Sequence, residues 1–226
     1  MEVGLMDPTA AGEAFLASFV LATPFVAFLR PRLLSLAAGA TLVAVGALLI
    51  EVLVQDTLSP LYASAVVLVL VAPPVEELLK FLVSGTTGAN FASAAGAGIG
   101  FAATENALYF LASWNDPVAL LVAFVAVRAL TDPLLHVTST TLTTLTWHGR
   151  SWGLPAGLAL HMLWNTAALV ETAADPAVGF LLIGVATVVV VGILVRLRRD
   201  REVRDTLDDR WQMNPWSGAL RTAGIV

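Results

Sequence analysis

Apolar runs long enough to cross a lipid bilayer follow one another through most of this chain. A transmembrane helix needs about 20 consecutive, mostly apolar residues, and short polar connections separate seven such runs. They cover residues 12–29, 33–54, 61–83, 91–112, 117–146, 154–171 and 176–197. Only 13% of the 226 residues are charged, whereas soluble domains carry about 25%. The pattern predicts an all-α, polytopic membrane bundle of about seven transmembrane helices, with residues 1–197 forming one domain.

Charge is divided unequally between the connections. Basic loop residues collect on the cytoplasmic side of membrane proteins. If seven spans alternate, the basic connections share a side with the C-terminus and the acidic connections share the other side. The basic group is Arg30, Arg32, Arg150, Arg196, Arg198, Arg199 and Arg201, and the acidic group is Asp7, Asp56, Asp116, Glu171 and Asp175. We expect a multi-pass cell-membrane protein with its N-terminus outside and residues 198–226 as a cytoplasmic tail.

The composition excludes several classes of protein. A net charge of −5 gives no electrostatic footprint for nucleic acid. The absence of cysteine excludes disulfides and thiolate metal ligands. Lys80 is the only lysine among 12 basic residues. Such use of arginine, together with much Ala, Val and Gly, suggests a prokaryotic source.

Ionisable side chains interrupt these apolar runs. An ionised group inside a bilayer costs from about 2.5 kcal/mol upward, so such groups usually have a function. Residues three or four positions apart on a helix share a face, and four runs carry polar groups, most of them at these spacings. The groups are Glu76 with Glu77 and Lys80, Glu105 with Asn106, Arg128 with Asp132 and His136, and His161 with Asn165. The pattern predicts a buried polar site to which several helices contribute.

Depth along the spans brings most of these groups together. With a rise of about 1.5 Å per residue, the first and last groups lie roughly 10–17 Å from the cytoplasmic ends of their spans. Glu105 lies deeper, at about 20 Å on a straight helix. Glu105 is therefore the residue whose depth fits a common site least well.

Structural explanations remain open for all four groups. A buried Glu105 could be neutral and bond to a backbone carbonyl, and His161 could serve only as a hydrogen-bonded core residue. Glu76, Glu77 and Lys80 could neutralise one another near the membrane surface, although one lysine cannot neutralise two carboxylates. Arg128 and Asp132, four residues apart, could form an ion pair.

Backbone features predict irregular packing around these groups. The pair Pro73-Pro74 removes two backbone donors just before Glu76 and should break the helix there. Ala92, Gly96 and Gly100 form a stripe of small residues at spacing four, which lets a neighbouring helix approach closely.

Two imidazoles with carboxylates and no cysteine match a catalytic zinc site of the His/His/Glu kind. Such a metal activates water, and a free glutamate takes the proton of that water. An amide nitrogen such as that of Asn165 can stabilise an oxyanion. The residues therefore predict metal-assisted hydrolysis of a peptide bond within the membrane.

Four segments resemble the ordered motifs of the PrsW family of intramembrane proteases, a branch of the group that contains the type II CAAX prenyl endopeptidases and bacteriocin-processing membrane proteases. They are Val75-Glu-Glu-Leu-Leu-Lys80, Gly100-Phe-Ala-Ala-Thr-Glu-Asn106, Arg128…His136 and His161…Asn165. Lys80, and Glu105 in place of histidine, depart from the CAAX pattern in the way that the PrsW branch does. The resemblance covers about residues 70–170.

This resemblance implies a centre made by Glu76, Glu105, His161 and Asn165, with His136 added. It also implies a membrane-anchored protein substrate and a zinc or other divalent metal cofactor. The expected roles are catalytic for Glu76, Glu77 and Asn165, metal-binding for Glu105, His136 and His161, and supporting for Lys80, Asn106, Arg128 and Asp132.

Two other functions use the same residues. A proton- or cation-coupled transporter also needs buried Glu, Arg and His side chains. Transporters usually show an internal repeat with paired broken helices, whereas only one break, at Pro73-Pro74, is evident. A non-catalytic membrane scaffold is the second alternative.

Overall fold

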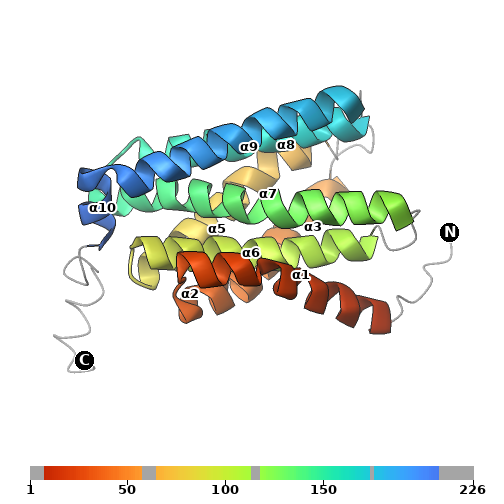
Figure 1. The fold of residues 1–226 in the computed structure, drawn as a ribbon, viewed down its shortest axis with the longest axis horizontal. Coiled ribbons are helices and arrows are strands. Elements are labelled where there is room, and N and C mark those ends of the chain that lie inside the picture. Colours follow the sequence, from red (N-terminus) through yellow and green to blue (C-terminus); the bar gives the residue numbers. More distant parts are fainter. Residues whose placement is uncertain (1–7, 58–64, 113–117, 174–175, 209–226) are drawn as a thin grey trace.

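The computed structural model describes residues 8–57, 65–112, 118–173 and 176–208, which form helices joined by short turns and contain no strand. The helices run nearly along the long axis of the molecule (Figure 1). They are α1 (Pro8–Leu29), α2 (Leu33–Ala38), α3 (Ala44–Thr57), α5 (Ala72–Thr86), α6 (Phe91–Ala112), α7 (Val118–Thr144), α8 (Gly153–Ala173), α9 (Pro176–Arg199) and α10 (Arg201–Asp208). The predicted all-α class is confirmed.

Three short segments with different winding connect these helices. The π-helical segment η1 (Gly39–Val43) joins α2 to α3, and the π-helical segment η2 (Val67–Val71) leads into α5. A 3₁₀ turn, η3 (Leu145–His148), follows α7. Within the described residues, each predicted apolar run contains helix, and the start of the run 61–83 lies outside them.

Three segments in the described part of the chain are long and apolar enough to cross a membrane: Leu33–Ile50, Gly153–Val170 and Ala177–Arg199. Large apolar side chains point outward from helices at the periphery. Examples are Phe28 on α1, Leu53 on α3, and Leu181 and Val188 on α9. The crossing of the membrane by all seven runs remains a prediction of the sequence.

Helix α6 lies between neighbours on several sides, and its small residues let them approach. A Cβ atom on Gly100 would overlap the carbonyl oxygen of Leu36 in α2, and one on Gly96 would lie 2.7 Å from the Arg32 carbonyl oxygen. The predicted small-residue stripe is thus where α2 packs. Gly98 faces α7 instead, where a Cβ atom would lie 2.7 Å from the backbone of His136. This close contact brings the polar face of α7 against α6.

At Pro73-Pro74 the chain changes its winding and does not break, which corrects the expectation from the sequence. Both prolines lie in the first turn of α5, and the π-helical segment η2 continues directly into this turn. The preceding η2 has i→i+5 bonding, and the N–H of Ala72 donates to the carbonyl of Val67. The next donor in this pattern would be Pro73, which has no N–H. The carbonyl of Leu68 is therefore left for another partner.

One end of the bundle, where α10 lies, carries the basic connections (Figure 1). Arg32 donates to the carbonyl of Thr87 in the turn between α5 and α6, and Arg150 pairs with Glu202 of α10. Asp7, Asp116 and Asp175 of the predicted opposite side lie outside the described residues, as do residues 209–226 of the predicted tail.

Candidate metal centre

The centre begins with three charged residues on one turn of α5. Lys80 lies 2.7 Å from Glu77 Oε1 and 3.7 Å from Glu76 Oε2, measured from its Nζ. The Lys80 side chain is 0% exposed, and both glutamates are buried. Because a buried ion pair needs further hydrogen bonds to offset its desolvation, the neighbouring helices must supply polar partners.

Helix α7 supplies two of these partners. Lys80 Nζ lies 2.7 Å from His136 Nδ1, and Ser139 Oγ donates to Glu77 Oε1 at 2.8 Å. An ammonium group has no acceptor, so Nδ1 of His136 accepts from Lys80. The ring of Phe101 on α6 lies 4.7 Å from the same ammonium nitrogen.

Helix α8 contributes His161. Its Nδ1 lies 2.9 Å from Glu77 Oε1, and its Nε2 lies 3.5 Å from Glu76 Oε2. A carboxylate only accepts hydrogen bonds, so Nδ1 carries the proton and Nε2 presents its lone pair towards Glu76. The His161 and His136 rings meet edge-on with 5.0 Å between their centroids.

A second set of charges adjoins His136 along α6 and α7. His136 Nε2 lies 2.9 Å from Glu105 Oε2, and Arg128 Nη2 lies 3.3 Å from Glu105 Oε1. Arg128 also forms the expected ion pair with Asp132, and its Nε donates to Asn106 Oδ1 at 2.9 Å. Glu105 therefore belongs to a set of charged residues that extends from His136 along the α6–α7 interface.

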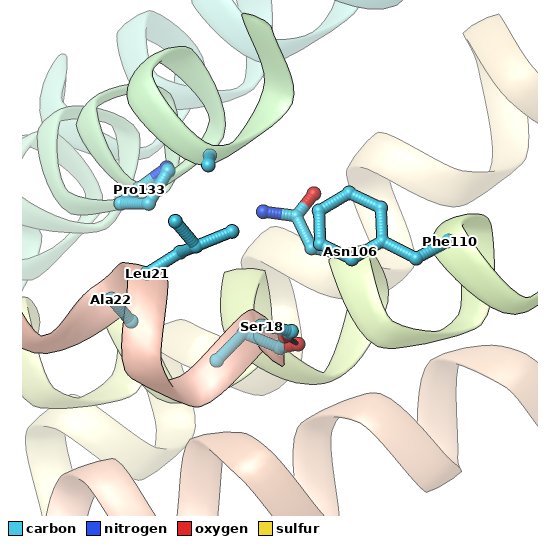
Figure 2. A pocket seen from close by; sticks show the side chains of 8 residues that line it. Ser18, Leu21, Ala22, Asn106, Phe110 and Pro133 are labelled. Atoms are coloured by element: carbon cyan, nitrogen blue, oxygen red, sulfur yellow. Dashed lines mark hydrogen bonds between the residues drawn. The ribbon is translucent and has the colours of Figure 1, made fainter. Parts of the chain in front are cut away.

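Helix α1 closes the outer flank of this second set. Figure 2 shows Asn106 of α6 beside a narrow space between Ser18 and Leu21 of α1 and Pro133 of α7. The space is too small for a water molecule. Ser18 donates to the carbonyl of Ala103. The α1–α6 contact therefore separates the charged residues Glu105, Arg128 and Asp132 from the surroundings on this side.

Two groups of side chains have potential ligand atoms close enough to share one metal ion. In each group the ligand atoms lie within 4.8 Å of one another, and His136 belongs to both. The groups are Glu76 with His136 and His161, and Glu105 with Asp132 and His136. The sequence led us to expect Glu105 as the third ligand beside the two histidines. In the structure the carboxylate grouped with both His136 and His161 is that of Glu76.

Formal charge favours a cation at this centre. Four carboxylates (Glu76, Glu77, Glu105 and Asp132) surround two cations (Lys80 and Arg128). If all are ionised, the cluster carries two excess negative charges in a largely buried setting. A divalent cation would balance these two charges. The carboxylate oxygens and imidazole nitrogens of the centre are donors that suit zinc.

Asn165 lies on α8 one turn after His161. Its Nδ2 donates to the carbonyl of Leu68 at 2.8 Å, which is the carbonyl left over at the change of winding before α5. Asn165 thus holds η2 against α8 directly before the turn that carries Glu76.

Three partners of the centre escaped the sequence reasoning. Ser139 lies three residues after His136 on the same helix face, and that spacing could have revealed it. Phe101 lies in the second motif but carries no charge. The Leu68 carbonyl has no sequence signal apart from its distance from Pro73. His148, in contrast, bonds to the carbonyl of Ala89 in the turn before α6 and takes no part in the centre.

The sequence matches a known protein family. The model for PrsW family intramembrane metalloproteases matches residues 29–195. It therefore spans α2 to α9, well beyond the segments that carry the motifs. No curated protein and no solved structure matches this chain.

These residues make up most of the chain, and the protein belongs to the PrsW family of intramembrane metalloproteases. Together with the three apolar helical segments, this membership makes it a membrane protein.

Proposed function

We propose that this protein is a metal-dependent endopeptidase that hydrolyses a peptide bond of a membrane-anchored protein substrate within the bilayer. The observation that carries the proposal is the convergence of Glu76, His136 and His161 from three helices, with ligand atoms within 4.8 Å of one another. A carboxylate also contacts one nitrogen of each imidazole: Glu105 contacts Nε2 of His136, and Glu77 contacts Nδ1 of His161.

Glu76, His136 and His161 are the residues that we expect to hold the metal, with zinc as the best fit to the donor set. Either Lys80 or Glu105 would give up its hydrogen bond to His136 to free the lone pair that the ion needs. When bound, the ion would supply a Lewis acid that polarises the scissile carbonyl and activates water. This assignment exchanges the roles that the sequence suggested for Glu76 and Glu105.

Glu77 and Lys80 position the imidazoles. Glu77 accepts the Nδ1 proton of His161, which fixes the ring so that Nε2 faces Glu76. Carboxylate partners of this kind set the tautomer of metal-binding histidines. Lys80 holds Glu77 and contacts Nδ1 of His136, so one ammonium group orients residues from two helices.

Glu105 is the carboxylate best placed to move a proton. Its side chain is 21% exposed, whereas those of Glu76 and Glu77 are 4% and 1% exposed. A general base must be reachable by water. Glu105 would accept the proton of the attacking water and return it to the leaving amine, and Arg128 would hold it ionised before the first transfer and after the second.

Asn165 combines a structural contact with a possible catalytic one. Its amide nitrogen has two N–H groups, and Leu68 accepts a hydrogen bond from this nitrogen. The remaining N–H is the group that we propose for the oxyanion of the tetrahedral intermediate.

The same proposal includes the topology. Residues 1–197 cross a prokaryotic cell membrane seven times, with the N-terminus outside and the tail from residue 198 in the cytoplasm. The gathering of Arg32, Arg150 and α10 at one end supports this orientation.

Cleavage of single-pass membrane proteins in proteoliposomes tests the function. We expect wild type to cleave and the variants Glu76→Gln and His161→Ala to lose activity by a factor of at least about 10². His148→Ala is the matched control and should cleave like wild type, because His148 lies outside the centre. Ion flux through wild-type protein without cleavage of any substrate would favour a transporter instead.

A further inference from the structure

A groove opens on the surface where α1 ends, α6 begins and α9 ends. It is lined by Ala27, Phe28 and Leu29 of α1, by Arg30, by Phe91 and Ala92 of α6, and by Arg198 of α9. It encloses about 450 Å³. Phe28 is 79% exposed and Phe91 is buried, so the groove has an apolar outer wall and an aromatic interior.

The two arginines of this groove carry positive charge without an acidic neighbour. Arg198 stacks its guanidinium on the Phe91 ring at 4.4 Å, which leaves the edge of the guanidinium available for hydrogen bonds. No acidic residue lines the groove. Other arginines at this end pair with carboxylates. The pairs are Arg150–Glu202, Arg196–Asp200 and Arg204–Asp205. Within the described chain, no carboxylate lies within ion-pair distance of Arg30 or Arg198.

The groove combines apolar walls with two guanidinium groups that have no acidic partner, which is the combination that an anionic lipid needs. Arginine binds phosphate through paired hydrogen bonds, and basic pockets between membrane helices bind anionic lipid headgroups. We propose that the groove is a binding site for an anionic phospholipid. The headgroup phosphate lies between Arg30 and Arg198, and an acyl chain follows Phe28 and Leu29. The proposal depends on the membrane location of the protein and not on its proteolytic activity.

Such a lipid would join three parts of the bundle. Arg30 follows the end of α1, Phe91 opens α6, and Arg198 lies in the last turn of α9. These segments are far apart in the sequence but meet at the groove. Because a ligand that binds only the folded state stabilises it, the bound lipid should raise the thermal stability of the protein.

A second groove provides a matched control. It is lined by Gly192, Val195, Arg196, Arg199, Asp200 and Arg201. This groove belongs to α9 and the start of α10 alone, and it contains the carboxylate of Asp200. Replacing Arg199 and Arg201 removes as much charge from the same end of the protein as replacing Arg30 and Arg198.

The test uses full-length protein in nanodiscs of phosphatidylcholine, alone or mixed in equal parts with phosphatidylglycerol. Native mass spectrometry counts the lipids retained after release from the nanodisc, and a thermal melt gives the stabilisation. We expect wild type to retain phosphatidylglycerol over phosphatidylcholine and to melt at a higher temperature in its presence. The double variant Arg30→Ala/Arg198→Ala should lose roughly thirtyfold in affinity and lose the thermal shift. Arg199→Ala/Arg201→Ala should keep both.

Several results would overturn the proposal. If wild type retained phosphatidylcholine as well as phosphatidylglycerol, the charge of the headgroup would be irrelevant. If both double variants lost the same phosphatidylglycerol affinity, the effect would be one of general surface charge. Thermal protection by inorganic phosphate alone would indicate a free-anion site. If the Arg30→Ala/Arg198→Ala protein does not fold, the single variants Arg30→Gln and Arg198→Gln replace it, and wild-type retention in both would also contradict the proposal.

Discussion

At the scale of single residues, the centre depends on one buried lysine. Lys80 contacts carboxylates on its own helix and an imidazole on α7, and its side chain is fully buried. Two adjacent glutamates could not both remain ionised in this setting without a cation beside them. Lys80 therefore explains why consecutive carboxylates are tolerated inside an apolar run.

Removing the charge of Glu77 should destabilise the protein strongly. Glu77→Gln leaves Lys80 buried with Glu76 as its nearest carboxylate, at 3.7 Å, and weakens the contact with His161. Breaking a buried ion pair costs about 3–5 kcal/mol. Denaturant unfolding in detergent measures the loss.

The exposed pair between Arg150 and Glu202 provides the comparison. Glu202→Gln should change stability by less than about 1 kcal/mol. Similar losses in the two variants would contradict the structural role that we assign to Glu77.

At the scale of helices, the change of winding before α5 determines where Glu76 and Glu77 point. The η2 segment, the two prolines and the contact from Asn165 act together, because the prolines leave the Leu68 carbonyl without a helical donor. Carbonyl groups at membrane depth must find such a partner within the protein.

Replacing Asn165 with leucine tests this coupling. The variant keeps the side-chain size but leaves the Leu68 carbonyl unsatisfied, which should cost about 1–3 kcal/mol. Thr166→Val is the control, because Thr166 is exposed and bonds only to Met162 of its own helix. Asn165→Leu should melt at a lower temperature than Thr166→Val. Equal melting temperatures would argue against a stabilising role for the hydrogen bond from Asn165 to the Leu68 carbonyl.

Close packing of α2 on α6 gives a second prediction at this scale. A Cβ atom on Gly100 would overlap the Leu36 carbonyl, so Gly100→Ala must move α2 away at a cost of about 1–3 kcal/mol. Gly192 on α9 has open space around it, and Gly192→Ala should leave stability unchanged or slightly higher. Urea titrations of both variants measure the difference, and an unaffected Gly100→Ala protein would refute the packing.

Helical spacing in the sequence predicted the contacts within single helices. The Arg128–Asp132 pair and the turn that joins Glu76 to Lys80 follow directly from spacings of three and four. Contacts between helices could not be predicted in this way, because they depend on helix rotation and separation. Lys80 with His136, and His161 with Glu77, are examples. The winding at Pro73-Pro74 was predicted as a break, since proline chemistry shows which donors are lost but not how the chain compensates.

At the scale of the whole molecule, polarity increases from the periphery to the centre. The apolar segment over α9 has only 22% of its residues buried inside the protein. Contact with lipid therefore explains why this helix is apolar. The helices α6 and α7 carry Glu105, His136 and a run of buried hydroxyl residues, and neighbouring helices cover them. Apolarity therefore identifies the outer helices more readily than the central ones.

Cysteine labelling tests the proposed orientation, because the natural chain contains no cysteine. Asp116 precedes α7 in the sequence and Ser151 follows it, so Asp116→Cys and Ser151→Cys are the variants to label. A membrane-impermeant maleimide should label Asp116→Cys in intact cells and Ser151→Cys only after the membrane is opened. Labelling of both from the same side would show that α7 does not cross, and the reverse pattern would invert the topology. Wild type provides the unlabelled control.

The central claim is that Glu76, His136 and His161 hold a divalent metal ion at a buried hydrolytic centre. The measurement that tests it most directly is the metal content of purified wild type, Glu76→Gln, Glu105→Gln and His148→Ala. We predict stoichiometric zinc in wild type, Glu105→Gln and His148→Ala, and a loss of tenfold or more in Glu76→Gln. The reason is that, among the described residues, Glu76 is the one carboxylate grouped within ligand distance of both histidines. Wild-type protein without metal, or a Glu76→Gln protein that retains it while Glu105→Gln does not, would contradict the account.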